Sequence, residues 1–165
     1  MTKIGLISDT HCGFDTDIME FLKDVNIIWH AGDFGNLETA DKIAAFKPLI
    51  GVYGNIDDAK VRTVYPKYQC FRCEDVKVLM THIGGYPGRY DKEAILKIDE
   101  FRPKIFISGH SHILKVMPDR KRNMLHINPG ACGHYGFHNL RTAIRFVIDG
   151  SDIRDLEVGE WKRKR

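Results

Sequence analysis

The first third of the chain alternates short apolar runs with segments of helical spacing. Residues 3–8, 27–29 and 49–52 are short and rich in β-branched side chains, which favours strands. Between them, residues 15–23 and 37–46 carry apolar side chains three and four positions apart, which favours amphipathic helices. This strand–helix–strand–helix–strand order predicts parallel strands that are joined by right-handed crossovers.

Much of the remaining chain has the sequence pattern of β-hairpins, in which two apolar runs are separated by a short turn. Asp149-Gly150-Ser151 is a strong turn sequence between two apolar runs, and Glu74-Asp75 separates another such pair. Residues 91–100 predict a third helix. The expected strands here cover residues 68–73, 76–81, 105–107, 115–117, 125–127, 141–148 and 153–158.

These elements predict an α/β fold in which two mixed β-sheets pack together with helices outside, a four-layer α/β/β/α sandwich. The chain has 165 residues, enough to bury roughly 70% of its unfolded surface in a core. Its 43% hydrophobic and 28% charged residues are globular values. We find no repeat, linker or break, so we expect a single domain over residues 1–165.

The charge balance argues against specific nucleic-acid binding. The chain has 25 basic and 22 acidic residues, a net charge of +3. Much of that charge lies in residues 162–165, which we expect to form a frayed basic tail. Outside this tail the balance is near zero, so no basic face is implied.

The chain also lacks the marks of secretion. The first apolar stretch, residues 4–7, ends before Asp9 and is too short for a signal peptide or a membrane span. The four cysteines are therefore expected to be reduced, and we interpret Cys70 and Cys73 as strand side chains in preference to a redox or metal pair. We expect a cytoplasmic protein without membrane contact.

Nearly every apolar strand run is followed within a few residues by a group that can bind a metal or a phosphate. In open α/β sheets, ligands lie beyond the carboxyl ends of the strands, so these groups are expected to converge in one crevice. Seven are too many for one tetrahedral zinc, whereas two ions sharing a bridging carboxylate would use them all. They are Asp9, His11, Asp33, Asn55, His82, His110 and His112.

The donor set also constrains the metal. Imidazole, carboxylate and amide oxygen together suit a divalent transition metal better than Mg or Ca, which prefer oxygen ligands throughout. We expect two such ions per chain, with Mn favoured and Ni, Co, Fe or Zn as alternatives.

Five blocks of sequence, in order, resemble the signature of the calcineurin-like metallophosphoesterases. The short length and Asn128-Pro129-Gly130 resemble the small single-domain phosphodiesterase branch, to which the metal-poor retromer subunit is also related. The resemblance implies the metallophosphoesterase fold. The five blocks are Asp9-Thr10-His11, Gly32-Asp33, Gly54-Asn55-Ile56-Asp57, His82 and Gly109-His110-Ser111-His112.

The resemblance also implies how the ligands are shared. Asp9, His11, Asp33 and His112 would hold one ion, and Asp33, Asn55, His82 and His110 the other. Asp33 would bridge the ions, and a bridging hydroxide would attack phosphorus in line. Asp33, Asn55 and His82 are accordingly the expected catalytic residues.

Two departures from the family pattern carry information. Many family phosphatases have a histidine proton donor where this chain has Ile56, so expulsion of a poor leaving group should suffer. Asp57, which would have held that histidine, is then expected to order a loop. After His82, where relatives often have His-Gly-His, Arg89 follows several glycines and could clamp phosphate; a solvated arginine on a flexible loop is the alternative.

Two further histidines follow the Asn-Pro-Gly element. We treat His134 as a candidate supporting residue and expect a His138→Ala variant to retain its metal. The predicted function is a metal-dependent phosphodiesterase acting on a small phosphoester. A phosphomonoesterase or nucleotide phosphatase, a DNA nuclease and a catalytically weak interaction scaffold are alternatives, and a homo-oligomer is possible.

Overall fold

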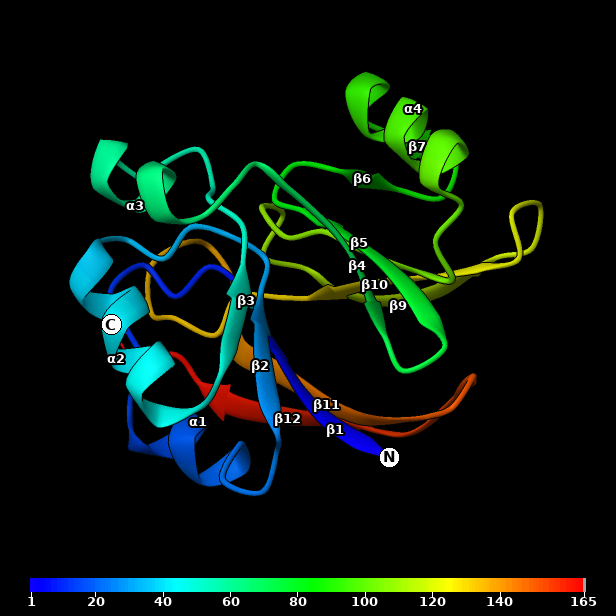
Figure 1. Ribbon diagram of the computed structural model, residues 1–165. Helices are drawn as coiled ribbons and strands as arrows, with labels where there is room; N and C mark the ends of the chain where they lie inside the picture. The colour runs from blue at the N-terminus through cyan, green and yellow to red at the C-terminus, as the bar shows by residue number, and fades with distance from the viewer. Residues whose placement is uncertain (165) are drawn as a thin grey trace.

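Two five-stranded sheets packed face to face form the centre of the molecule (Figure 1). The computed structural model describes residues 1–164. The first sheet has the strand order β12-β11-β1-β2-β3, in which β1, β2 and β3 are parallel, as their alternation with helices predicts. Its strands are β1 (Thr2–Ile7), β2 (Ile27–His30), β3 (Leu49–Gly51), β11 (Leu140–Asp149) and β12 (Asp152–Lys162).

The second sheet has the order β4-β5-β8-β10-β9 and mixes parallel with antiparallel pairs. Strands β5, β8 and β10 are parallel, while β4 and β9 pair antiparallel at the two edges. Its strands are β4 (Tyr68–Cys73), β5 (Val76–Thr81), β8 (Ile105–Ile107), β9 (Leu114–Asp119) and β10 (Met124–Pro129), and a short pair is formed by β6 (Gly85–Tyr86) and β7 (Arg89–Tyr90).

Each sheet is covered on its outer face by helices that begin at an Asp or Asn cap. Helices α1 (Thr16–Phe21) and α2 (Leu37–Phe46) bury Ile18 and Ile43 against the first sheet. Helix α4 (Lys92–Phe101) buries Ile98 against Phe106 of the second. The predicted four-layer α/β/β/α sandwich is therefore confirmed (Figure 1).

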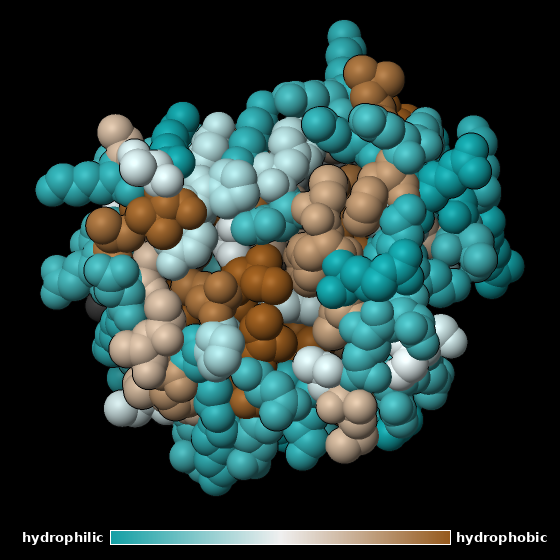
Figure 2. All heavy atoms as spheres, in the orientation of Figure 1, coloured by the Kyte–Doolittle hydropathy of each residue, from teal (hydrophilic) through white to brown (hydrophobic). Residues whose placement is uncertain are grey.

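The main core lies between the sheets and draws on both. Leu6 and Trp29 from the first sheet pack in one cluster with Met80 and Ile127 from the second. Figure 2 shows that hydrophilic residues cover most of the face seen in Figure 1, while apolar residues gather near its middle. The shared core fixes the two sheets relative to each other, and with them the loops at their strand ends.

One helix and one pair of short strands were not expected from the sequence. Helix α3 (Ala59–Val64) buries only Val61, so it lacks the apolar stripe that marks a helix; Asp58 caps it instead. Strands β6 and β7 have two residues each, which is too few to show the alternation of apolar and polar residues that marks a strand in sequence.

Of the residues expected to form a frayed tail, 162–165, the structure places Lys162 in a strand. Lys162 ends β12, in register with β11, and the backbone N–H of Arg163 donates to the carbonyl of Asn139 at 3.3 Å. These bonds hold Lys162 and Arg163. Arg165 lies outside the described residues.

Across residues 1–164, no helix has the length and apolar character needed to cross a bilayer.

Candidate metal centre

The seven predicted ligands all stand on loops that follow strands. Strands β1, β2 and β3 of the first sheet lead into four of them, and β5 and β8 of the second sheet lead into the other three. Because the sheets pack face to face, these loops meet at one end of the sandwich. The first sheet supplies Asp9, His11, Asp33 and Asn55; the second supplies His82, His110 and His112.

The side chains form two adjacent groups, each able to hold one metal ion. Asp9, His11 and His112 form one group, and Asp33, His82 and His110 the other; within each, the potential ligand atoms lie within 4.8 Å of one another. This division is the one that the family resemblance implies.

Asp33 lies between the two groups. Its Oδ2 is 3.2 Å from Nε2 of His82 in its own group and 3.5 Å from Nε2 of His11 in the other. Asn55 joins the second group, because its Oδ1 is 3.0 Å from Nδ1 of His110. One carboxylate thus reaches both groups, as a bridging ligand must.

Three buried atoms in these groups have no hydrogen-bond partner: Oδ1 of Asp9, Nε2 of His11 and Nε2 of His82. His82 donates its Nδ1–H to the carbonyl of Ala31 at 2.7 Å, so its Nε2 carries a free lone pair toward the centre. An unpaired buried polar group costs about 1–3 kcal/mol, and cations at this position would satisfy all three. The residues therefore fit a pair of divalent metal ions.

The charge states suit a cation site. Burial by itself would raise the pKa of Asp9, but contacts with His11, His112, His82 and Ser8 outweigh it and lower that pKa well below its usual range. Burial would lower the pKa of His82, but the carboxylates of Asp33 and Asp9 outweigh it and raise the value. The carboxylate of Asp9 therefore stays charged at neutral pH.

Five ligands have a left-handed backbone. The φ angles of Asp9, His11, Asp33, His110 and His112 are 54°, 43°, 59°, 71° and 63°. Such conformations cost a non-glycine residue of order 1–3 kcal/mol and tend to occur at functional sites. Here they turn the chain sharply after each strand, so that the side chains point inward and the backbones continue outward.

Two glycines of the sequence blocks permit close approach between these loops. A Cβ on Gly54 would collide with the side chain and backbone of Asp33, and one on Gly109 would collide with Ser8. The glycines before Asn55 and His110 are thus required by packing around the ligands.

Asp57 orders the loops around Asp33. Its carboxylate accepts three backbone N–H bonds, from Phe34 at 3.2 Å, Gly35 at 2.9 Å and Gly54 at 2.8 Å. These bonds tie the loop after β2 to the loop after β3. The side chain of Asp57 thereby stabilises the positions of Asp33 and Asn55.

His30, just before the Asp33 loop, supports the turn from Asp9 to His11. The Gly32 N–H donates to its Nδ1 at 3.0 Å, so the neutral ring donates from Nε2 to the hydroxyl of Thr10, also at 3.0 Å. Complete burial lowers the pKa of His30 to about 3 and keeps the ring neutral.

Sequence reasoning missed two aromatic side chains in residues 133–138. His138 Nδ1 lies 3.3 Å from Nδ1 of His112, and the Tyr135 ring packs on His11 with centroids 4.9 Å apart. His138 therefore lies beside a predicted ligand, a contact that the sequence does not reveal. Only loop geometry could reveal it, because His138 lies far along the loop that follows β10, which ends at Pro129.

The tautomer of His138 fixes that of His112. His138 donates Nε2–H to the carbonyl of Gly133 at 2.9 Å, so its Nδ1 is an acceptor and takes the Nδ1–H of His112. His112 then directs the lone pair of Nε2 toward Asp9 Oδ1, 3.2 Å away. Such a partner orients a metal-binding histidine.

Replacing His138 by alanine is accordingly expected to weaken metal binding by about 10–100-fold, because His112 loses the acceptor that orients it. Competition against a chromophoric chelator measures this affinity. His138→Asn, which keeps an acceptor, should recover part of it. The matched control is His134→Ala in the same loop, and equal affinity in the two alanine variants would contradict the positioning role.

His134 and Arg89 are not brought to the ligands. The His134 ring contacts Asp15 at 3.3 Å and accepts the N–H of Lys164, because the left-handed turn at Gly136 separates it from His138. Arg89 is exposed on β7 and lines neither of the cavities beside the ligands. A role for Arg89 in binding phosphate stays a prediction.

The ligands open into a cavity of about 480 Å³. His11, Asp33, Asn55 and His110 line its inner side, and Phe137, fully exposed, stands at its rim. A small molecule can therefore reach both groups of ligands from solvent.

A comparison with protein-family models matches most of the chain. A family model described as the calcineurin-like phosphoesterase superfamily domain matches residues 2–151. A curated protein of Methanothermobacter thermautotrophicus named "probable metallophosphoesterase" is 29% identical over 137 residues, which cover 78% of this chain and 76% of that protein.

Two solved structures share the fold. An archaeal protein described as a novel phosphodiesterase has a TM-score of 0.72 at 22% identity, covering 94% of this chain and 99% of that one. Vps29 of Entamoeba histolytica, solved as a complex with Zn²⁺, has a TM-score of 0.74 at 15% identity, covering 98% and 99%. At these identities the likeness is one of fold alone.

Proposed function

The chain belongs to the calcineurin-like phosphoesterase superfamily, and from this we propose that it is a metal-dependent phosphodiesterase acting on a small phosphoester. The observation that carries the proposal is the pair of ligand groups sharing Asp33, with buried ligand atoms that have no other partner. Two divalent ions, with Mn favoured over Ni, Co, Fe and Zn, fit this donor set.

When bound, the ions would neutralise phosphoryl oxygens and make a water-derived nucleophile available near neutral pH. The chain's own residues would fix the geometry. Asp33 would hold both ions at a set separation, while Asn55 and His82 complete the second group. Asp57 would keep Asp33 in place through the three backbone N–H groups that it binds.

Ile56 supports the choice of a diester over a monoester. Its side chain is partly exposed and lines the cavity that contains Asp33 and Asn55, so it stands where a leaving group could be protonated. A hydrocarbon cannot donate that proton. Activated leaving groups depart without protonation. The missing proton donor should therefore lower activity mainly on substrates with poor leaving groups.

For an aryl diester, kcat/KM is expected to exceed that for the matching aryl monoester, and Ile56→His should raise activity on substrates with poor leaving groups. A well-placed general acid contributes about 10²–10⁴-fold, and a grafted one should give much less. The test compares bis(4-nitrophenyl) phosphate with 4-nitrophenyl phosphate, each with Mn, Ni, Co, Zn or Mg. A preference for the monoester with every metal would favour a phosphomonoesterase.

A scaffold of the same fold is the alternative from another class. All seven ligand residues are present here, whereas a chain that had lost the chemistry would be expected to lose ligands first. Elemental analysis of purified protein separates the two functions, since the scaffold predicts far fewer than two ions per chain.

A further inference from the structure

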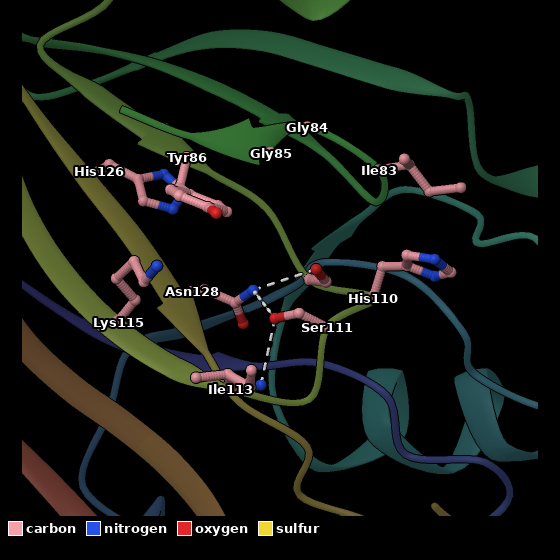
Figure 3. A pocket seen from close by; sticks show the side chains of 11 residues that line it. Ile83, Gly84, Gly85, Tyr86, His110, Ser111, Ile113, Lys115, His126 and Asn128 are labelled. Atoms are coloured by element: carbon pink, nitrogen blue, oxygen red, sulfur yellow. Dashed lines mark hydrogen bonds between the residues drawn. The ribbon is translucent and has the colours of Figure 1, made fainter. Parts of the chain in front are cut away.

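A second cavity, of about 280 Å³, adjoins the one that contains the ligands. His110, Ser111 and Ile113 line both, so the two cavities lie on either side of this short loop. In Figure 3, His110 lies toward one end of the second cavity, and Lys115 and His126 lie toward the other. Its volume is at the small end of ligand sites, which suits one part of a substrate.

The walls of this second cavity are held by hydrogen bonds within the protein. Asn128 donates from Nδ2 to the carbonyl of Gly109 at 3.0 Å and to Oγ of Ser111 at 3.1 Å (Figure 3). On the other wall, Ser108 donates to the carbonyl of Gly85. The cavity is therefore formed before any ligand enters, which lowers the entropic cost of binding.

Much of the cavity lining is apolar. Ile83, Ile113 and the ring of Tyr86 supply carbon surface, and Gly84 and Gly85 add backbone without side chains. A planar group can lie against such a wall, whereas a hydroxyl-rich sugar would lose hydration there without compensation.

Two polar side chains beside Tyr86 could still bind a ligand. His126 is 1% exposed and donates Nδ1–H to the carbonyl of Phe106 at 3.2 Å, so its Nε2 is an acceptor. Burial lowers the pKa of His126 to about 4, which keeps the ring neutral at pH 7. Lys115 lies 3.6 Å from the centroid of the Tyr86 ring and joins none of the ion pairs among residues 1–164.

We propose that this cavity binds one ester arm of the substrate and that the arm ends in a heteroaromatic base, as in a nucleoside 5′-phosphodiester. The inference rests on the proposed phosphodiesterase function. A planar base matches the apolar wall; its ring N–H can donate to Nε2 of His126, and its carbonyl can accept from Lys115. A diester has two arms, and the two cavities flank His110, where the phosphorus would be held.

The test uses three diesters that share the 4-nitrophenolate leaving group. They carry thymidine (as its 5′-phosphate ester), phenyl or methyl as the second arm. For the unaltered protein, kcat/KM should be at least tenfold higher for the thymidine ester than for the methyl ester, with the phenyl ester between them. Lys115→Met should reduce that ratio about tenfold, since a hydrogen bond from a charged group contributes about 1.5–3 kcal/mol.

The loss should appear in KM for the thymidine ester and leave the methyl ester within twofold. Lys121→Met, at the exposed far turn between β9 and β10, is the matched control and should change neither substrate. His126→Gln, which can still donate to Phe106, should also lower the ratio; if it does not fold, Lys115→Met decides.

Two results would overturn the inference, and they differ in what else they imply. An unchanged ratio in Lys115→Met, with the methyl ester still hydrolysed, rejects the base-binding cavity alone. Failure to hydrolyse any of the three diesters with any metal rejects the phosphodiesterase function and the arm site together.

Discussion

Asp33→Ala is expected to abolish activity and to lower the amount of bound metal. The Asp33 carboxylate is the side chain whose oxygen lies within 3.5 Å of a histidine in both ligand groups, so its loss uncouples them. Metal ions supply several kcal/mol of transition-state stabilisation, which corresponds to a fall in kcat/KM of about 10³-fold or more. Steady-state kinetics and elemental analysis of the same sample measure both effects.

Two further variants sharpen this experiment. Asp33→Asn keeps the shape of the side chain but removes its charge, so it should also lose most activity. Asp17→Ala removes an exposed carboxylate of α1 and should keep both metal and activity. Near-normal turnover in Asp33→Ala would reject the two-metal assignment.

Asp57→Ala is expected to destabilise the fold by about 3 kcal/mol or more, because three backbone N–H groups lose their acceptor at once. That is a large fraction of the roughly 5–15 kcal/mol that holds a domain folded. Urea unfolding of the metal-free protein measures the change without any contribution from ion binding. Activity should fall less than in Asp33→Ala, since Asp57 acts through the loops.

The neighbouring Asp58 provides the control. It caps α3 and accepts one backbone N–H, from Val61 at 3.2 Å, so Asp58→Ala should cost about 1 kcal/mol. Equal destabilisation of the two variants would show that the three bonds to Phe34, Gly35 and Gly54 stabilise the fold no more than the single helix cap does.

The sequence was most informative where one physical rule governs many residues. Alternation of strands and helices requires parallel β1, β2 and β3, and parallel strands place Asp9, Asp33 and Asn55 at one edge. The convergence of the ligands could be predicted for this reason. Which atoms of the ligands would lack hydrogen-bond partners could not, because that depends on distances of a few tenths of an ångström.

The sequence was least informative in the loops. His134 and His138 are four residues apart in one polar segment, yet one contacts Asp15 and the other His112. Their directions are set by the turn at Gly136, where φ is 132°, and by pairing with distant backbone. Loops of this kind carry no periodic pattern from which side-chain direction follows.

The position of β1 has a consequence for synthesis on the ribosome. This strand is translated before the other strands and helices of the fold, but one of its neighbours is β11, whose pairing aligns Thr2 with Ile148. At about 5–20 residues per second, that neighbour follows on the order of ten seconds or more later. During this interval the nascent chain exposes one unpaired edge of a strand whose last four residues are apolar, and such an edge is prone to aggregate. Chaperone binding to the first half of the chain should therefore end once residues 140–149 leave the exit tunnel.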